Sequence, residues 1–344
     1  MKKVVVLGHF AFGIDKSNGQ TVKTKVIAAE LQRVFSREEV GMEDTMGGMR
    51  FLFRLPIVLI RMLIRYRNIV ILPAYKGVRI IVPLLVILNY FFRRKLHYVV
   101  IGGWLPQYVR KYPLLRWSLA RLDGIYVETL LMKQEISLAA TFSDLFVMPN
   151  CKRLDIVSNN DFPPLKAPPY KLCTFSRVMK EKGIGEAVEA VETCNKQAGK
   201  TLFTLDIYGP IVEPEWFDDI ISGRQNVNYC GVVPYSQSIY VLKRYFALLF
   251  PTYYHGEGFA GTIIDALSAG LPTIASDWKA NNEIIDNGKT GLLFTPQSIE
   301  ALTDTLNTIA NHPEAIYAMR RNCIAEAKNY QPEVVLKALT ERIR

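Results

Sequence analysis

The sequence predicts an α/β fold of two doubly wound, Rossmann-like domains, and three observations carry this prediction. The chain has 344 residues, more than one hydrophobic core usually organises. Segments with strand and helix patterns alternate through both halves. A polar, proline-rich stretch over 149–169 separates the two series. We expect an N-terminal domain over 1–155, a linker over 156–169, a second domain over 170–325, and a C-terminal helix within 326–344 that can pack back on the first domain.

Each half contributes its own series of elements. In the first half we expect strands over 3–7, 69–73, 97–101, 124–127 and 145–148, and helices over 20–35, 56–67, 79–93, 113–121 and 130–139. In the second half we expect strands over 171–176, 202–208, 227–230, 246–250, 272–275 and 291–294, and helices over 184–198, 214–222, 236–243, 261–269 and 280–286 and from 298 onward. Such sheets bind ligands beyond the carboxyl ends of their strands, so we expect the site in the cleft between the domains.

The composition narrows the class of protein. Hydrophobic residues make up 49% and charged residues 22% of the chain, which excludes a disordered protein. The five cysteines are scattered and form no Cys-x-x-Cys pair, so the sequence favours neither a disulfide framework nor a zinc site and suits a reducing cytoplasm.

Two cations follow the first strand of the second domain. Arg177 comes directly after the strand, and Lys182 lies beside the expected start of the next helix. Both the charges and the helix N-terminus favour an anion such as a phosphate. The alternative is that both residues are ordinary loop charges.

A glycine-rich segment from His255 to Pro272 leads from a strand into a helix. Its glycines leave backbone N–H groups open to a phosphate, while Glu257 and Asp265 supply carboxylates that can accept hydrogen bonds from sugar hydroxyls. Alternatively, Glu257 only complements the helix dipole and Asp265 belongs to a solvated helix face.

The same segment contains a Gly-x-Gly-x-x-Gly pattern over 256–261, with Asp277 about where a ribose-binding acid would lie in an NAD-dependent oxidoreductase. Five residues separate the strand end near Phe250 from the first glycine, whereas a dinucleotide-binding turn follows its strand at once. The oxidoreductase is therefore the less favoured alternative.

The second domain resembles the family-4 retaining glycosyltransferases over roughly 170–295. The motifs that carry the resemblance are Arg177-x4-Lys182-Gly183, the strand and turn over 205–209, Gly231-Val232-Val233-Pro234, Glu257-Gly258-Phe259 with its second acid, and the segment over 270–276. The family pattern is Glu-x7-Glu, and here the second acid is Asp265, one methylene shorter.

The resemblance implies the GT-B architecture, with a nucleotide-sugar donor such as a UDP- or GDP-sugar held by the second domain and the acceptor by the first. It implies that Arg177 and Lys182 neutralise the leaving diphosphate, that Glu257 binds donor-sugar hydroxyls, that Asp265 binds the ribose and that the backbone around Val233 binds the base. The donor-binding loop would include Gly258, Phe259, Ala260, Gly261 and Thr262. It also implies retention of configuration without a metal or other cofactor, and the chain contains no Asp-x-Asp pair.

The first domain departs further from the family. Gly19 stands where a glycine-rich loop would meet the diphosphate, but Asn18 replaces one glycine of the usual pair. The strand end where family members often carry a histidine reads Ile101-Gly102-Gly103-Trp104. We expect His97, at the start of that strand, to be structural.

The basic residues are concentrated in the first half. Residues 1–150 contain 22 Lys and Arg against 10 Asp and Glu, and between Thr45 and Leu122 there are 14 cations and no acid. With its apolar runs, the region over 50–94 resembles a surface that docks on an anionic membrane. The alternative is a buried helix with one wet face, and few stacking aromatics accompany the cations, so nucleic acid is not expected. The uncharged, largely apolar run over 80–92 is too short to span a bilayer.

Together these features predict a cytoplasmic glycosyltransferase, peripheral on the inner face of the membrane. It would transfer a sugar from a nucleotide diphosphate to a glycan or lipid-linked acceptor in cell-surface polysaccharide biosynthesis. The alternative from another class is a catalytically silent nucleotide-sugar or glycan-binding protein on the same scaffold.

Overall fold

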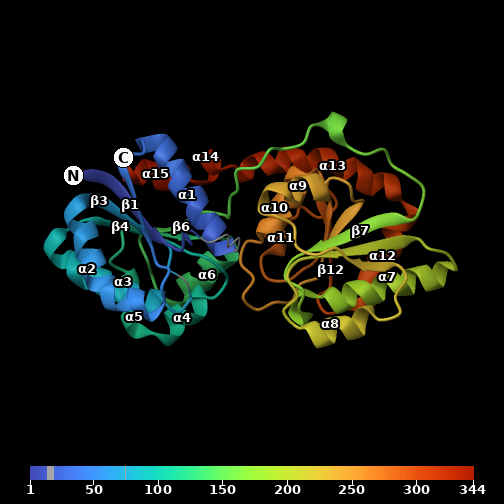
Figure 1. The fold of residues 1–344 in the computed structure, drawn as a ribbon, viewed down its shortest axis with the longest axis horizontal. Coiled ribbons are helices and arrows are strands. Elements are labelled where there is room, and N and C mark those ends of the chain that lie inside the picture. Colours follow the sequence, from blue (N-terminus) through green and yellow to red (C-terminus); the bar gives the residue numbers. More distant parts are fainter. Residues whose placement is uncertain (14–18, 74) are drawn as a thin grey trace. The chain divides into compact units, whose positions relative to one another are not determined.

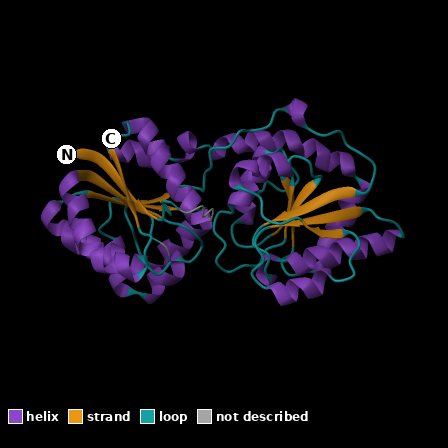
Figure 2. Ribbon diagram, in the orientation of Figure 1, coloured by secondary structure: helices purple, strands orange, loops and turns teal. Residues whose placement is uncertain are grey.

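The computed structural model describes residues 1–13, 19–73 and 75–344. The chain divides into two compact units (Figure 1). Unit 1 comprises Met1–Arg153 and Tyr330–Arg344, and unit 2 comprises Leu154–Asn329. Each unit contains a six-stranded sheet whose strands all pair in parallel, and helices lie on both faces (Figure 2). The predicted α/β, doubly wound fold class is confirmed.

The sheet of unit 1 has the order β2-β1-β3-β4-β5-β6. Its strands are β1 (Lys2–Gly8), β2 (Val40–Asp44), β3 (Tyr66–Ile71), β4 (Lys95–Val99), β5 (Gly124–Val127) and β6 (Leu145–Val147). The apolar run in β1 is fully buried, as expected of a strand covered on both faces. β2 was not predicted from the sequence, because this edge strand buries only Val40 and so lacks an apolar run.

Two layers of helices cover this sheet. One layer packs on the larger apolar core and contains α2 (Met49–Arg65), α3 (Val78–Phe92), α4 (Leu105–Lys111), α5 (Pro113–Leu119) and α6 (Leu130–Ala139). The other contains α1 (Gly19–Phe35), α14 (Pro332–Val335) and α15 (Lys337–Ile343). The last two come from the C-terminal segment, and both chain ends lie together in unit 1, where Lys3 Nζ donates to the Arg344 carbonyl at 2.8 Å (Figure 1). No helix among the described residues is long and apolar enough to cross a membrane.

The helix expected over 56–67 begins earlier, at Met49, and Pro56 lies inside it. The expectation that Pro56 stands near the helix start was wrong. Pro56 is exposed, so water can satisfy the Leu52 carbonyl that proline leaves without its helical N–H donor. Leu55, Leu59 and Met62 are buried at helical spacing, and this packing stabilises the helix across the proline.

Arg61, in the acid-free region, forms an ion pair within the chain. Arg61 Nη2 lies 2.6 Å from Glu43 Oε1 on β2, just outside the segment counted for its lack of acids. The count of charges between Thr45 and Leu122 does not reveal this pair, because it leaves out the neighbouring strand.

The sheet of unit 2 has the order β12-β11-β10-β7-β8-β9. Its strands are β7 (Tyr170–Phe175), β8 (Phe203–Tyr208), β9 (Val227–Tyr229), β10 (Ala247–Phe250), β11 (Thr273–Ser276) and β12 (Gly291–Phe294). Its helices are α7 (Ile184–Ala198), α8 (Pro214–Ile221), α9 (Ser238–Leu242), α10 (Gly261–Ser268), α11 (Asn281–Ile284), α12 (Ile299–Asn311) and α13 (Pro313–Ala327). One face packs on α7, α8 and α12, and the other on α9 and α10.

The segment expected to be a linker packs against unit 2. Val157 N–H donates to the Ser268 carbonyl at 3.0 Å, at the end of α10. The ring of Phe162 lies against Gly270, where a Cβ would come within 2.4 Å of it. These contacts place 154–169 with the second unit rather than between the two units.

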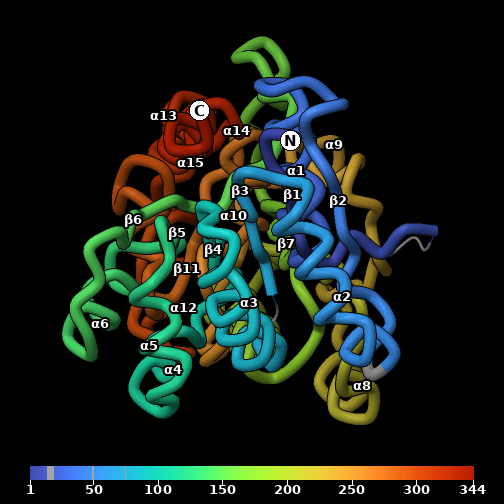
Figure 3. The backbone as a smooth tube through the Cα atoms, turned by 90° about the vertical axis from the view of Figure 1, so that its left-hand side faces the viewer, coloured from blue at the N-terminus to red at the C-terminus, as the bar shows by residue number. Residues whose placement is uncertain are grey.

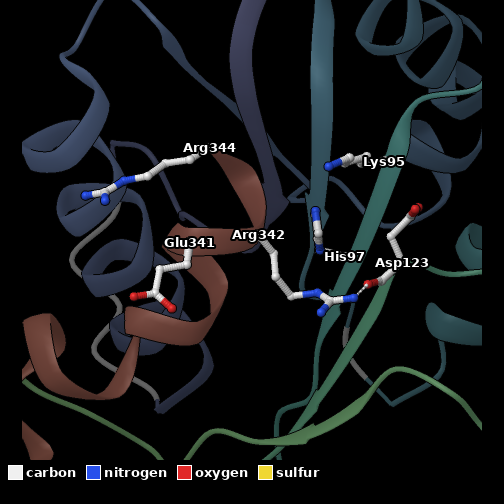
Figure 4. Close-up of a pocket in the computed structure, with 6 residues that line it drawn as sticks. All are labelled: Lys95, His97, Asp123, Glu341, Arg342 and Arg344. Carbon is white, nitrogen blue, oxygen red and sulfur yellow. Dashed lines mark hydrogen bonds between the residues drawn. The ribbon is translucent and has the colours of Figure 1, made fainter.

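A pocket of about 350 Å³ lies at the amino ends of β4 and β5, in unit 1 (Figure 4). Arg342 reaches across it from α15, donates to the Asp123 carbonyl at 3.0 Å and pairs with Asp144. His97 is buried at its floor, where Nδ1 lies 3.3 Å from the Tyr126 hydroxyl. Burial, followed by the Arg342 and Lys95 charges, lowers the pKa of His97 to about 4. These contacts attach the C-terminal segment to the sheet.

Candidate functional site

The strand order of unit 2 defines where a ligand would bind. The chain runs outward from β7 through β8 to β9, returns to β10 on the other side of β7, and continues to β11 and β12. β7 and β10 are therefore neighbours at a topological switch point, where the loops leaving their carboxyl ends diverge and form a crevice. These two loops contain Arg177, Lys182 and Glu257.

The loop after β7 brings Lys182 against the loop after β10. A 3-10 turn over Lys180–Lys182 is joined to α7 by Gly183, whose φ is 70°. A Cβ at Gly183 would come within 2.1 Å of the Pro251 carbonyl oxygen, so only glycine permits this approach. The Lys182 side chain is 8% exposed as a result, whereas Arg177 is exposed.

Lys182 and Glu257 form an ion pair in which Nζ donates to Oε2. The buried Thr252 hydroxyl donates to the same carboxylate oxygen at 3.0 Å. The Glu257 side chain is 11% exposed, and burying such charges is costly unless they are paired and hydrogen-bonded. Two residues that the sequence placed in separate motifs are therefore in direct contact.

The ring of Tyr254 contacts both cations of the site. Arg177 Cζ lies 5.1 Å and Lys182 Nζ 5.0 Å from its centroid. The negative face of an aromatic ring attracts cations at such distances. Trp278 Nε1 donates to the Tyr254 carbonyl at 3.0 Å and so fixes the backbone that carries the ring. The Tyr254 ring therefore stabilises two positively charged side chains, Arg177 and Lys182, close to each other.

Tyr254 and Thr252 were not predicted as site residues from the sequence. They lie in the stretch between the end of β10 and the first glycine, which belongs to none of the motifs that predicted the site. Their positions directly after a buried strand were the available signal, because side chains at strand ends of a doubly wound sheet face the ligand edge.

A second polar pair supports the same loop. Burial raises the pKa of Glu186, in the first turn of α7, and this carboxyl is hydrogen-bonded to Tyr253. Burial, followed by the Glu186 charge, raises the pKa of the Tyr253 phenol. Tyr253 N–H donates to the Glu181 carbonyl at 2.9 Å. The loop after β10 is thus bonded to both ends of the Gly183 turn.

The glycine-rich loop leads into α10 as expected. Phe259 and Ala260 are buried, and Gly261 is the first helical residue. The Thr262 hydroxyl donates to the Phe175 carbonyl at 2.9 Å, so it joins α10 to the end of β7. Asp265 lies one turn further along α10 and is 3% exposed. The solvated-face alternative for Asp265 is therefore wrong.

Val233 lies at the other end of the same sheet edge, in the loop after β9. Three strand spacings, about 14 Å, separate β9 from β10. Gly209, with φ 135°, turns the chain after β8, where a Cβ would come within 1.7 Å of the Ser176 carbonyl oxygen. Only glycine therefore permits this close approach of the loops after β7 and β8.

Gly19 belongs to unit 1 and is the first residue of α1. Asn18 and the four residues before it lie outside the described residues. Helix α1 is anchored by Lys23, whose buried Nζ donates to the Val100 carbonyl at 2.9 Å and to Glu128 Oε1 at 2.5 Å. Glu128 Oε2 also accepts the Gly102 N–H at 3.2 Å, so this pair connects α1 to the strand ends that carry the 101–104 turn.

Within the described ranges, no group of three or more His, Cys, Asp or Glu side chains is placed to hold a metal ion. Arg177, Lys182 and Glu257 supply charged side chains at the switch point.

Two doubly wound units, with a switch-point site of this kind in the second, define a GT-B protein. The fold matches HepE from Anabaena, solved in complex with UDP-glucose, with a TM-score of 0.76 and 16% identity over 100% of this chain and 99% of that chain. A family model described as "Glycosyl transferases group 1" matches residues 158–330. This is half of the chain, and the chain therefore belongs to that family, as the resemblance in the sequence indicated.

Two curated relatives each match about half of the chain. The UDP-N-acetylglucosamine–peptide N-acetylglucosaminyltransferase GtfA subunit of Streptococcus pneumoniae is 28% identical over 51% of this chain and 34% of its own length. The alpha-monoglucosyldiacylglycerol synthase of Acholeplasma laidlawii is 27% identical over 47% of this chain and 40% of its own length. The match thus spans about a third of the first of these proteins. The family membership leaves the oxidoreductase alternative without support.

Proposed function

We propose that this protein is a retaining glycosyltransferase that needs neither a metal nor another cofactor. It transfers a sugar from a UDP- or GDP-sugar to a glycan or lipid-linked acceptor in cell-surface polysaccharide biosynthesis. The observation that carries the proposal is the Lys182–Glu257 pair beside Arg177 at the switch point of β7 and β10. Family membership and the UDP-glucose complex of a structural neighbour support it.

The two cations suit the departing diphosphate. As the bond between the sugar and the diphosphate breaks, negative charge grows on the leaving oxygen, and fixed cations stabilise that charge. The Lys182 ammonium has three N–H donors, so it can keep Glu257 as a partner and also donate to a phosphate oxygen. Arg177 is exposed and supplies a planar fork of donors that matches a phosphate.

Glu257 can serve the donor sugar while it holds Lys182. Both bonds to its side chain, from Lys182 and Thr252, reach Oε2. Its other carboxylate oxygen can accept hydrogen bonds from sugar hydroxyls. In this assignment Asp265 binds the ribose, the backbone at Val233 binds the base, and the loop over 258–262 contacts the phosphates.

The acceptor is assigned to unit 1 by the same edge rule. Tyr75 follows β3 and Trp104 follows β4, and their ring centroids are 5.8 Å apart. Aromatic rings at a sheet's carboxyl edge offer flat apolar faces on which the C–H face of a sugar can stack. This pair supports a glycan as the acceptor or as its first part.

Substitution of single charges tests the proposed roles. Lys182→Ala and Arg177→Ala should each lower transfer about a hundredfold, the usual cost of losing one electrostatic transition-state contact. Glu257→Gln should lower turnover more than donor affinity, and Asp265→Asn should mainly lower donor affinity. Lys180→Ala is the matched control, because Lys180 is exposed in the same 3-10 turn and should transfer at the parental rate.

Calorimetry measures the binding of UDP, GDP and the corresponding nucleotide sugars. Transfer or hydrolysis of the same nucleotide sugars is then measured, and NMR identifies the anomer of the product. Parental rates in Lys182→Ala and Arg177→Ala would refute the diphosphate contact. Transfer that stops in excess chelator and returns with magnesium would refute metal independence. Tight binding of a nucleotide sugar without any turnover would instead establish the catalytically silent binding protein.

We also propose that unit 1 docks on the anionic inner face of a membrane through residues 50–94. Helices α2 and α3 are adjacent in this layer (Figure 3), and their outer surfaces expose Phe53, Ile57, Tyr90 and Phe91 among the arginines. Apolar side chains that enter the interface and cations that meet lipid headgroups act together, each surface cation contributing about 1 kcal/mol. The likeness to a diacylglycerol glucoside synthase is consistent with such a location.

Liposome flotation tests this docking. Binding should require acidic lipid and weaken as salt rises. It should fall at least tenfold in Arg54→Glu/Arg65→Glu, which avoids the paired Arg61. Lys25→Glu/Lys337→Glu makes the same charge change on exposed residues of α1 and α15, in the opposite helix layer, and should bind as the parent does. Equal loss in both double variants would show that net charge alone governs binding.

A further inference from the structure

An apolar pocket of about 660 Å³ lies in unit 1 between the end of α3, the start of β4 and α5. Val86 and Leu96 form its buried floor, and Ile87 and Trp117 form its sides. Its size is typical of a small-molecule site. The pocket lies at the amino edge of the sheet, since α3 leads into the first residue of β4 here, so it is separate from the carboxyl edge assigned to the acceptor.

The rim of this pocket exposes large aromatic side chains to water. Tyr90 is 80% and Phe91 is 79% exposed, at the last turn of α3. Their rings pack edge to face with centroids 5.5 Å apart, so they form one surface rather than two isolated residues. A contiguous apolar patch beside a hollow marks a binding surface.

Two arginines border the same hollow, Arg121 with its side chain held in place and Arg93 with its backbone held in a turn. Arg121 stacks on Trp117, with Cζ 4.0 Å from the ring centroid, and its Nη1 donates to the Trp117 carbonyl at 2.8 Å. Arg93 caps α3 in the left-handed conformation, at φ 53°. Asn89 fixes this turn, because it accepts the Arg94 N–H at 2.7 Å and donates to the Arg94 carbonyl at 2.8 Å.

The charge around the pocket argues against a second copy of this chain as its occupant. The pocket lies within the segment from Thr45 to Leu122, which has 14 Lys and Arg and no acid. A symmetric dimer through this face would place cations against cations. The complementary occupant is apolar at one end and anionic at the other.

We propose that this pocket binds one acyl chain of an anionic phospholipid, whose phosphate pairs with Arg93 and Arg121. The inference rests on the membrane docking proposed above and assigns it a defined lipid site. Tyr90 and Phe91 enter the interface beside the bound lipid, as amphipathic aromatic residues do at membrane surfaces. The arginines bind the phosphate by their N–H forks.

Monomeric short-chain lipid separates this site from general attachment to a vesicle. Dihexanoyl phosphatidylglycerol, kept below its critical micelle concentration, should bind saturably and shift the tryptophan emission. The shift should be absent in Trp117→Phe. Dihexanoyl phosphatidylcholine and glycerol phosphate should each bind at least tenfold more weakly, because the first carries no net negative charge and the second lacks the chains.

The test variant is Ile87→Asp and the matched control is Ile57→Asp. Ile87 lines the pocket, whereas Ile57 is an exposed isoleucine of α2 outside it, so both variants add one carboxylate to the same face. Ile87→Asp should lower affinity for the short-chain lipid at least tenfold, and Ile57→Asp should leave it unchanged. Vesicles with a photoreactive acyl phosphatidylglycerol should label peptides over 86–96 or 117–121 in the parent.

The outcomes distinguish the two proposals. Flotation with acidic vesicles but no binding of the monomeric lipid would overturn the pocket and leave the docking intact. Loss of both would overturn both. Equal loss of lipid binding in Ile87→Asp and Ile57→Asp, equal binding of glycerol phosphate, or a parental dimer that Ile87→Asp dissociates would each overturn the pocket assignment.

Discussion

Lys182 is in contact with a carboxylate and with two aromatic rings, and these contacts determine its role at the switch point. Glu257 pairs with the ammonium, and the centroids of the Tyr254 and Phe250 rings lie 5.0 Å and 5.7 Å from Nζ. The lysine is therefore oriented before any phosphate arrives, and a preorganised charge loses little energy to reorganisation when the reaction proceeds. Arg177 has only the Tyr254 ring as its described aromatic contact and is exposed, so it suits the outer side of a diphosphate.

His97 provides the pH-dependent prediction at the residue scale. Its pKa is about 4 in the folded protein and about 6.5 when unfolded, so below pH 6.5 the unfolded chain binds a proton that the folded chain does not. The free energy of unfolding should therefore fall as the pH is lowered from 6.5 to 4, by about 3 kcal/mol in total. Lys95, Arg342 and Asp144 are the charges that act on the ring, and Tyr126 is its hydrogen-bond partner.

Urea unfolding of the parent and of His97→Gln at several pH values checks this prediction. The variant keeps a polar group beside Tyr126 but cannot titrate, so its stability should change less across this range. Identical pH profiles for the two proteins would show that other groups cause the acid sensitivity.

The residues of the site could be predicted only where a motif carried them. Arg177, Lys182 and Glu257 were found because they lie in a recognisable order of strand, cation, glycine and acid. Their contact was not predictable, because it depends on the approach of Gly183 to Pro251 across 68 residues of chain. Tyr254 and Thr252 belong to no motif, and only the fold shows what they touch.

In α2, local and tertiary preferences conflict. Pro56 disfavours the helix interior, and the helix predicted from the sequence accordingly begins there. The buried stripe of Leu55, Leu59 and Met62 needs the helix to continue, and packing prevails. The buried strands were predictable because their apolar runs are continuous, whereas β2 was not because only one of its residues is buried.

Pro56→Ala should raise the free energy of unfolding. Alanine restores the N–H donor to the Leu52 carbonyl and removes the clash of the proline ring. The missing hydrogen bond and the clash together cost up to about 3 kcal/mol in a helix interior. Part of this gain is lost because alanine gives the unfolded chain more conformational freedom. We therefore expect the free energy of unfolding to rise by about 1–2 kcal/mol. Urea unfolding measures the difference.

The control for this substitution is Ile57→Ala, at the next exposed position of the same helix. It removes no proline and should change stability by less than about 0.5 kcal/mol. A Pro56→Ala protein no more stable than the parent would mean that the helix bends at Pro56 in a way that the core requires.

At the scale of the whole molecule, the C-terminal segment is structurally part of the unit that begins the chain. Leu336, Leu339 and Ile343 are buried in the core that α1 and the first strands form. Arg342 adds bonds to Asp123 and Asp144, and its guanidinium lies 4.5 Å from the Phe146 ring. Unit 1 therefore depends on residues that follow unit 2 in the sequence.

Leu339→Ala tests this dependence. The leucine is fully buried, and its truncation should cost unit 1 about 2–5 kcal/mol through lost burial and the cavity left behind. Hydrogen exchange should speed up in β1 and β3 of unit 1, while β7 and β8 of unit 2 exchange at the parental rate. Calorimetric affinity for UDP should also stay unchanged, because the proposed contacts to the base, ribose and diphosphate other than Gly19 lie in unit 2.

The matched control is Leu138→Ala, an exposed leucine of α6 in the same unit, which should leave both exchange and UDP affinity at parental values. Faster exchange of β7 and β8 in Leu339→Ala, to the same extent as β1 and β3, would show that the two units unfold as one. In that case the C-terminal segment would stabilise the whole chain. Faster exchange confined to unit 1 would instead show that this segment stabilises unit 1 alone, the unit proposed to bind the acceptor and the membrane.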